Sequence, residues 1–237
     1  MPPLVLHSLF EALAWILAIA IGWWARRRYF PAASLPMAGA RYPLYLLFLW
    51  LGAVAGAFGL GSLNLALAGI PGGGRSILGA IVGGILVAEI YKAASGVRGS
   101  TGAVFVLPLS IAIAVGRLGC FSAGLADYTY GTPTGLPWGV DFGDGIHRHP
   151  VQLYESLAMA CFALAFFLWL RREPQSAARY GFYIFAGFYA AQRFLWEFLK
   201  PYPRLIGPFN LFHLAAALLL IYAFVMLRRP WRIHAIA

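Results

Sequence analysis

The sequence predicts an all-α, polytopic membrane protein with seven transmembrane helices. Of its 237 residues, 61% are hydrophobic and only 11% are charged, whereas soluble domains carry about 25% charged residues. The apolar stretches reach the roughly 20 residues that a helix needs to cross a bilayer. The segments between them are too short for a soluble domain. We therefore expect one transmembrane domain over residues 1–237.

The predicted spans lie at about residues 4–25, 43–66, 76–94, 102–119, 151–170, 180–199 and 208–227. In the first, the basic cluster Arg26 to Arg28 follows the apolar run, so we expect a span and not a cleaved signal peptide. Most other basic residues lie on the same side of the membrane as this cluster. By the positive-inside rule that side is cytoplasmic, which places the N-terminus outside and the C-terminus in the cytoplasm.

The charge and the cysteines exclude several classes of function. The net charge of +10 is carried mostly by loops next to apolar segments, so membrane orientation and anionic lipid headgroups explain it better than nucleic acid does. Cys120 and Cys161 form no disulfide framework. Because no ligand spacing typical of a metal site occurs, we expect neither a metal nor another cofactor.

Two glycine pairs in the second and third spans are typical of helices that pack closely on a neighbour. Gly52 and Gly56 lie four residues apart, as do Gly79 and Gly83. Small residues at this spacing let two membrane helices approach each other. We expect a packing role for them.

Polar side chains gather where the predicted topology places the outer leaflet. Those at the span ends are Arg75, Arg117, Gln152, Glu155, Arg193 and His213. Arg193 is the most telling, since an arginine at a helix centre costs at least about 2.5–3.5 kcal/mol unless it faces a partner or a wet cavity. Tyr189, Arg193 and Glu197 are spaced i, i+4, i+8 and share one helix face. An Arg193–Glu197 structural pair is the alternative to a functional site. Near the inner face, Glu89 and Lys92 are expected to form an ordinary interfacial pair.

The polar segment 120–150 is expected to cap the outer end of the bundle. After it, Pro150 suits the first turn of span five, whose free N–H groups and positive dipole end favour an anion. Arg117 and Arg193, with Arg75 or Arg148, would add fixed charge for a phosphodiester.

The residues around the start of span five suggest further roles. For His149, at or next to the N-cap, a general base and a helix cap both stay open. Gln152 and Glu155 lie one helical turn apart, so they can orient Arg117 or His149. His213 is either a substitute base or the partner of a neighbouring helix.

Together these motifs resemble the prolipoprotein diacylglyceryl transferases. The resemblance rests on Gly116-Arg117-Leu118-Gly119, the Gly131 loop, Leu136 to Val140, Arg148 to Glu155, and Tyr189-x-x-x-Arg193-Phe194-x-x-Glu197, over roughly residues 70–200. It implies an enzyme of the bacterial cytoplasmic membrane that takes a diacylglyceryl group from phosphatidylglycerol and places it on the lipobox cysteine of a prolipoprotein. Glycerol phosphate is released. Arg117, Arg193 and Tyr189 then match the family's catalytic arginines and tyrosine.

Three departures from the family pattern concern the acceptor side of the reaction. The histidine of the family's His-Gly-Gly-Leu segment is absent from the matching stretch Ser76 to Ile81. Cys120 replaces the asparagine of Gly-Arg-x-Gly-Asn, and Asn210 to His213 replaces a glutamine region. The sequence therefore predicts a transferase with an anionic phospholipid donor, acting on a prolipoprotein signal peptide or on another acceptor. The alternatives are a non-catalytic phospholipid-binding protein and, third, a transporter, which would need a polar path through both leaflets.

Overall fold

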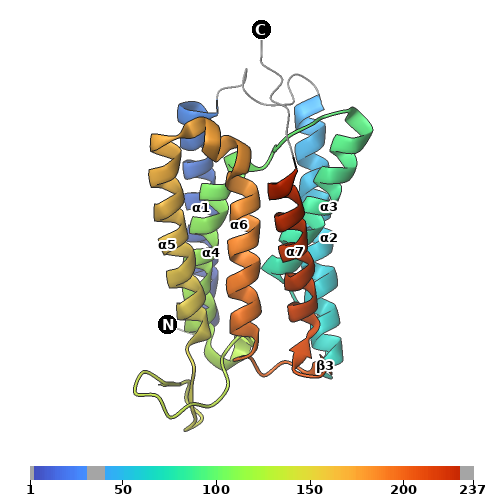
Figure 1. The fold of residues 1–237 in the computed structure, drawn as a ribbon. Helices are drawn as coiled ribbons and strands as arrows, with labels where there is room; N and C mark the ends of the chain where they lie inside the picture. The colour runs from blue at the N-terminus through green and yellow to red at the C-terminus, as the bar shows by residue number, and fades with distance from the viewer. Residues whose placement is uncertain (1–2, 31–40, 230–237) are drawn as a thin grey trace.

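The computed structural model describes residues 3–30 and 41–229, and within these ranges the chain forms a bundle of seven α-helices. They are α1 (Pro3–Tyr29), α2 (Arg41–Leu67), α3 (Ile77–Ser95), α4 (Ala103–Ala123), α5 (Val151–Arg172), α6 (Pro174–Glu197) and α7 (Leu211–Arg228). The helices run side by side, and the connections lie at the two ends of the bundle (Figure 1). The N-terminus and the two small hairpins lie at the same end.

Each predicted span corresponds to one helix, and six of the seven helices are long and apolar enough to cross a membrane. The exception is α6, which begins at Pro174, earlier than expected, and carries polar side chains along its whole length. Arg179, Gln192, Arg193 and Glu197 lower its hydropathy. The composition and length of the other six helices make the chain a multi-pass membrane protein, while its orientation stays a prediction.

The packing role expected for the glycine pairs is confirmed, and the structure shows that the two pairs face each other between α2 and α3. A methyl group at Gly56 would overlap the carbonyl oxygen of Gly79, and one at Gly52 would lie 2.8 Å from the carbonyl oxygen of Gly83. Further along the same helix, a methyl group at Gly61 would lie 2.5 Å from the carbonyl oxygen of Gly74. The two helices therefore touch through their backbones.

The remaining helices pack as a second group, with α1 on α4, α4 on α5, and α6 on α7. The α4–α5 contact includes a buried hydrogen bond in which the Ser156 hydroxyl donates to the carbonyl oxygen of Ala114 at 2.7 Å. Phe185, Ala186 and Ala190 of α6 are fully buried. This helix thus lies in the core of the bundle, which explains how it tolerates a polar face.

A loop of 27 residues between α4 and α5 projects beyond the helix ends (Figure 1). It contains the short 3-10 helix η2 (Gly124–Asp127) and the strands β1 (Val140–Asp141) and β2 (His147–Arg148), which pair antiparallel. The Asp141 carboxylate accepts three backbone N–H groups, at 2.8 Å, 3.1 Å and 3.0 Å, and these bonds lower its pKa. A second hairpin, β3 (Arg204–Ile206) and β4 (Phe209–Asn210), precedes α7.

An apolar cavity of about 190 Å³ separates the α2–α3 pair from α4, α6 and α7. Ile77, Ile81 and Phe105 line its walls, and Glu89 and Lys92 contribute to its polar end. The predicted Glu89–Lys92 pair is confirmed at 2.9 Å, and the Tyr222 hydroxyl donates to the same carboxylate.

Candidate functional site

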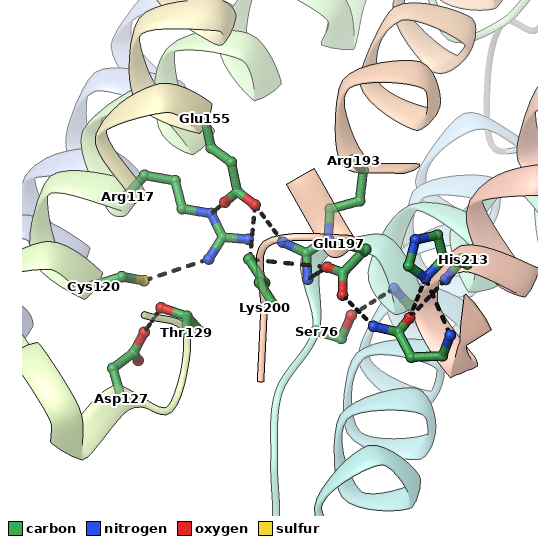
Figure 2. Close-up of polar contacts among 12 residues, drawn as sticks. Ser76, Arg117, Cys120, Asp127, Thr129, Glu155, Arg193, Glu197, Lys200 and His213 are labelled. Atoms are coloured by element: carbon green, nitrogen blue, oxygen red, sulfur yellow. Dashed lines mark hydrogen bonds and ion pairs between the residues drawn. The ribbon is translucent and has the colours of Figure 1, made fainter. Parts of the chain in front are cut away.

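The Glu155 carboxylate lies at the centre of a buried charge cluster near the hairpin end of the bundle. One oxygen contacts the Arg193 guanidinium at 2.5 Å and the Lys200 ammonium at 2.8 Å. The other oxygen pairs with Nε of Arg117. The two arginines reach this carboxylate from opposite sides, from α4 and from α6 (Figure 2). Side chains far apart in the sequence thus meet at one place, as the sequence predicted for Arg117 and Arg193.

A second carboxylate extends the cluster towards α7. Glu197 contacts Arg193 at 2.7 Å and Lys200 at 3.9 Å, and it accepts the Asn210 side-chain amide at 2.9 Å. Asn210 in turn caps α7 by accepting the His213 backbone N–H at 3.0 Å. Contacts therefore run from α4 to α7 through four helices.

The cluster, defined as Arg117, Glu155, Arg193, Glu197 and Lys200, is almost dry. Each of these residues is at most 5% exposed. Three cations face two carboxylates, so one positive charge stays uncompensated. Burial and the nearby Arg193 guanidinium lower the pKa of Lys200 to about 8. This surplus charge favours an anion at the cluster.

Further buried polar atoms surround the cluster without a hydrogen-bond partner among the described residues. They include both amide atoms of Gln152 and Gln192 and the Tyr189 hydroxyl. Because buried polar groups in folded proteins are nearly always satisfied by protein, water or ligand, such a group requires an occupant. Gln152 and Tyr189 were both predicted to belong to the site.

Arg75 and Arg148, both expected to bind the headgroup, pair with carboxylates elsewhere. Arg75 is well exposed and pairs with Glu11 of α1 at 2.7 Å. Arg148 forms a two-pronged pair with Asp144 inside the loop, at 2.6 Å and 2.7 Å, and its hydrogen bonds lower the pKa of Asp144. Neither has a recorded contact with the charge cluster within the described ranges. Their role in binding a headgroup stays a prediction.

His149 is not the cap of α5, so that half of its prediction is wrong. The N-cap position belongs to Pro150, and no side chain caps this helix. The His149 ring lies 3.5 Å from the Tyr154 hydroxyl, while its backbone pairs with Gly131 and Thr132 of the loop. This backbone pairing holds the histidine one residue before the N-cap.

His213 is a capping residue of its own helix. Its Nδ1 accepts the Asn210 backbone N–H at 3.1 Å, which completes a capping box with the bond described above. The ring is fully buried and packs edge-on against Phe194, Phe198 and Phe209. Among the described residues, its hydrogen bonds link it to the cluster through Asn210.

The cluster member Lys200 and the adjoining Asn210 were missed as site residues in the sequence analysis. Lys200 follows Glu197 by three positions, the spacing of neighbours on one helix face, and this signal was available. Asn210 has the residue type preferred at an N-cap. Its contact with Glu197 depends on the β3–β4 hairpin, which no sequence pattern placed.

The chain is similar to proteins of one known family. The family model described as prolipoprotein diacylglyceryl transferase matches residues 6–229. The chain belongs to this family. The match extends well beyond the 70–200 region in which the resemblance was first apparent.

Curated relatives of the family match a shorter part of the chain. Those from Bordetella parapertussis and Clostridium tetani, both named phosphatidylglycerol–prolipoprotein diacylglyceryl transferase, are 34% identical over 139 residues and 37% identical over 141 residues. These matches cover 57% and 56% of this chain and 52% and 54% of the relatives. The chain thus spans about half the length of the curated relatives it matches. No solved structure matches it.

The stretch Ser76 to Ile81, which was matched in the sequence analysis to the family's His-Gly-Gly-Leu segment, begins with a helix cap. Ser76 is the N-cap of α3, and its hydroxyl accepts the Gly79 backbone N–H at 3.1 Å. A serine cap satisfies the helix start but supplies no base near neutral pH. Among the residues Ser76 to Ile81, no side chain titrates near neutral pH.

Proposed function

We propose that this protein transfers the diacylglyceryl group of phosphatidylglycerol to a thiol, the lipobox cysteine of a prolipoprotein, at the outer leaflet of the bacterial cytoplasmic membrane. The observation that carries the proposal is the buried surplus positive charge of the Arg117–Glu155–Arg193–Glu197–Lys200 cluster. A lipid phosphate is an anion that reaches such a depth from the bilayer. Its binding would compensate the positive charge that the two carboxylates do not neutralise.

The geometry suits phosphate as the leaving group. In the reaction, the acceptor sulfur forms a bond to the glyceryl carbon while the bond from that carbon to the phosphate oxygen breaks. The electron pair leaves with glycerol phosphate, so negative charge develops on the phosphate oxygen. Arginines positioned by Glu155 would stabilise that charge. To reach them, the phosphate competes with Glu155 for the guanidinium groups.

The runner-up is a membrane protein that binds anionic phospholipid without turning it over. The Ser76 cap favours it, since the position of the family's histidine carries no group with a pKa near neutral. This alternative retains the charge cluster and its ligand but predicts no bond cleavage.

One assay separates the two functions. Purified protein in proteoliposomes is given phosphatidylglycerol with a radiolabelled glycerol headgroup, with and without a lipobox peptide, and released glycerol phosphate is measured. Peptide-dependent release supports the transferase. Binding of the lipid without release of glycerol phosphate supports the runner-up. Release of glycerol phosphate that does not depend on the peptide rejects this acceptor.

The first prediction concerns the arginines in that assay. Arg117→Ala and Arg193→Ala should each lower turnover by at least about 100-fold, the usual scale for removing one donor to a developing oxyanion. Arg193→Lys keeps the charge but loses the planar fork, so it should also be impaired. Arg171→Ala is the matched control, because Arg171 lies in the last turn of α5, where it stacks on Phe167. Full activity of Arg193→Ala would reject the proposed site.

A further inference from the structure

Three potential metal ligands that are far apart in the sequence meet beside the charge cluster. They are His7 of α1, Cys120 of α4 and Asp127 of η2, and their ligand atoms all lie within 4.8 Å of one another. All three are partly buried. The trio adjoins the charge cluster, since Nη1 of Arg117 lies 3.8 Å from the Cys120 sulfur (Figure 2).

Local structure brings these residues together. Gly119 lets α1 approach α4, because a methyl group there would lie 2.9 Å from Cβ of Phe10 and 3.2 Å from the carbonyl oxygen of His7. After α4, Gly124 adopts a positive φ of 62° and turns the chain into η2. The Thr129 hydroxyl then donates to the Asp127 carboxylate (Figure 2). Carboxylates that bind a metal typically accept such a hydrogen bond from a residue that does not itself bind the metal.

One atom of the trio lacks a partner. Nδ1 of His7 is shielded from solvent and has no hydrogen-bond partner among the described residues. A buried ring nitrogen in this state requires an occupant such as a water or an ion. Imidazole nitrogen, thiolate sulfur and carboxylate oxygen together are the donor set that suits Zn²⁺.

We propose that His7, Cys120 and Asp127 bind one Zn²⁺ ion, with the fourth coordination position left open. In a tetrahedral zinc site the ligand atoms lie roughly 3.3–3.8 Å apart, so each ligand atom would move by less than about one ångström. The thiolate and the carboxylate balance the two charges of the ion. The nearby Arg117 guanidinium is already paired with Glu155 and so opposes the cation less.

The open position gives the ion a role that rests on the proposed function. A thiol that binds Zn²⁺ loses its proton to solvent and becomes a bound thiolate. The acceptor sulfur would then attack the glyceryl carbon as an anion, and no protein base is needed for that step. Two departures noted in the sequence would then be linked in this protein. Cys120 stands in place of the asparagine of the Gly-Arg-x-Gly-Asn motif, and the stretch at the start of α3 contains no histidine.

Metal content tests the site independently of catalysis. The full-length protein is stripped with a chelator, reloaded with Zn²⁺, and analysed by mass spectrometry for bound metal. Loading with Co²⁺ reports the ligands, since a thiolate ligand adds a charge-transfer band in the near ultraviolet. We expect one ion per chain and that band in the wild type, and at least a tenfold weaker affinity in Cys120→Ser and in His7→Ala. Cys161→Ser is the control, because this exposed cysteine lies on α5.

The outcomes separate the metal site from the transferase. Absence of bound zinc, equal binding by Cys120→Ser, or a cobalt spectrum without the thiolate band overturns the site. Zinc bound as expected but with no peptide-dependent release of glycerol phosphate rejects the proposed function and leaves the site intact. Release that is equal in stripped and reloaded protein overturns the thiol-activating role.

Discussion

Glu155 shows how one residue determines the properties of its neighbours. It is the counter-ion of Arg117, Arg193 and Lys200 at once. Breaking a buried ion pair by removing one partner typically costs about 3–5 kcal/mol, since the remaining charge is buried alone. Glu155 therefore has both a structural and a positioning role, and changes to it alter both at once.

Lys200 makes lipid binding dependent on pH, which is the second prediction. Its lowered pKa of about 8 in the free protein should rise when an anionic headgroup binds nearby. Affinity for phosphatidylglycerol is therefore fully present below about pH 8 and falls as the pH rises above that value, because the ammonium then loses its proton. Binding to lipid nanodiscs, measured on both sides of this pH, checks the expectation.

Two substitutions sharpen that test. Lys200→Arg stays charged throughout, so its affinity should not change across this pH range, and Lys200→Met should bind weakly at every pH. A wild-type protein whose affinity stays constant through this range would contradict the assignment.

At the same scale, the sequence predicted the Arg193–Glu197 pair and the Glu155–Arg117 contact between helices, but not the partners of Arg75 and Arg148. The Arg193–Glu197 pair followed from a spacing of four, and the structure has it at 2.7 Å. Arg75 and Arg148 instead bind Glu11 and Asp144. Which carboxylate an arginine meets depends on helix rotation and loop path, and neither is encoded in a local pattern.

At the scale of the helix, the cap of α7 provides the third prediction. His213→Gln retains a side chain that can occupy the same position of a capping box, so it should keep near wild-type turnover and stability. His213→Ala should lose about 0.5–2 kcal/mol, the usual cost of a lost cap. Thermal unfolding in detergent and the glycerol phosphate assay measure both. Loss of turnover in a stable His213→Gln protein would instead identify the ring as a base.

The α2–α3 contact provides the fourth prediction. Gly56→Ala should destabilise the protein by about 1–3 kcal/mol, because its methyl group would overlap the backbone of α3. Gly59→Ala on the same helix is the matched control, since nothing lies within 4 Å of its added methyl group. It should leave the unfolding midpoint unchanged or raise it slightly. Equal midpoints for the two variants would contradict the close packing.

The helices themselves could be predicted from hydropathy, apart from the start of α6. The prediction began this helix at residue 180, whereas the structure begins it at Pro174. The hydropathy of the first two turns is too low to predict a membrane span. Proline at the first position and packing in the core stabilise these turns as helix. Tertiary contact, which a hydropathy window does not include, decides this boundary.

At the scale of the whole molecule, the fifth prediction concerns orientation. If the hairpin end faces outward, a single cysteine at Gly135→Cys should react with a membrane-impermeant maleimide in intact cells. One at Gln175→Cys, in the first turn of α6, should react only after lysis. Both would be placed in a Cys120→Ser, Cys161→Ser background, and both sites are exposed. The reverse pattern would invert the topology and place the charge cluster at the cytoplasmic leaflet.

The backbone contacts between α2 and α3 also constrain how the bundle can deform. Side chains between two helices can change rotamer and let the helices slide, but glycine carbonyls in direct contact have no such freedom. These two helices therefore translate or tilt only together, as one stiff hairpin. If the apolar cavity between this hairpin and α4, α6 and α7 widens, we expect the backbone to move mainly in the connections before α2 and after α3. The arginines of the charge cluster would then move less than these connections.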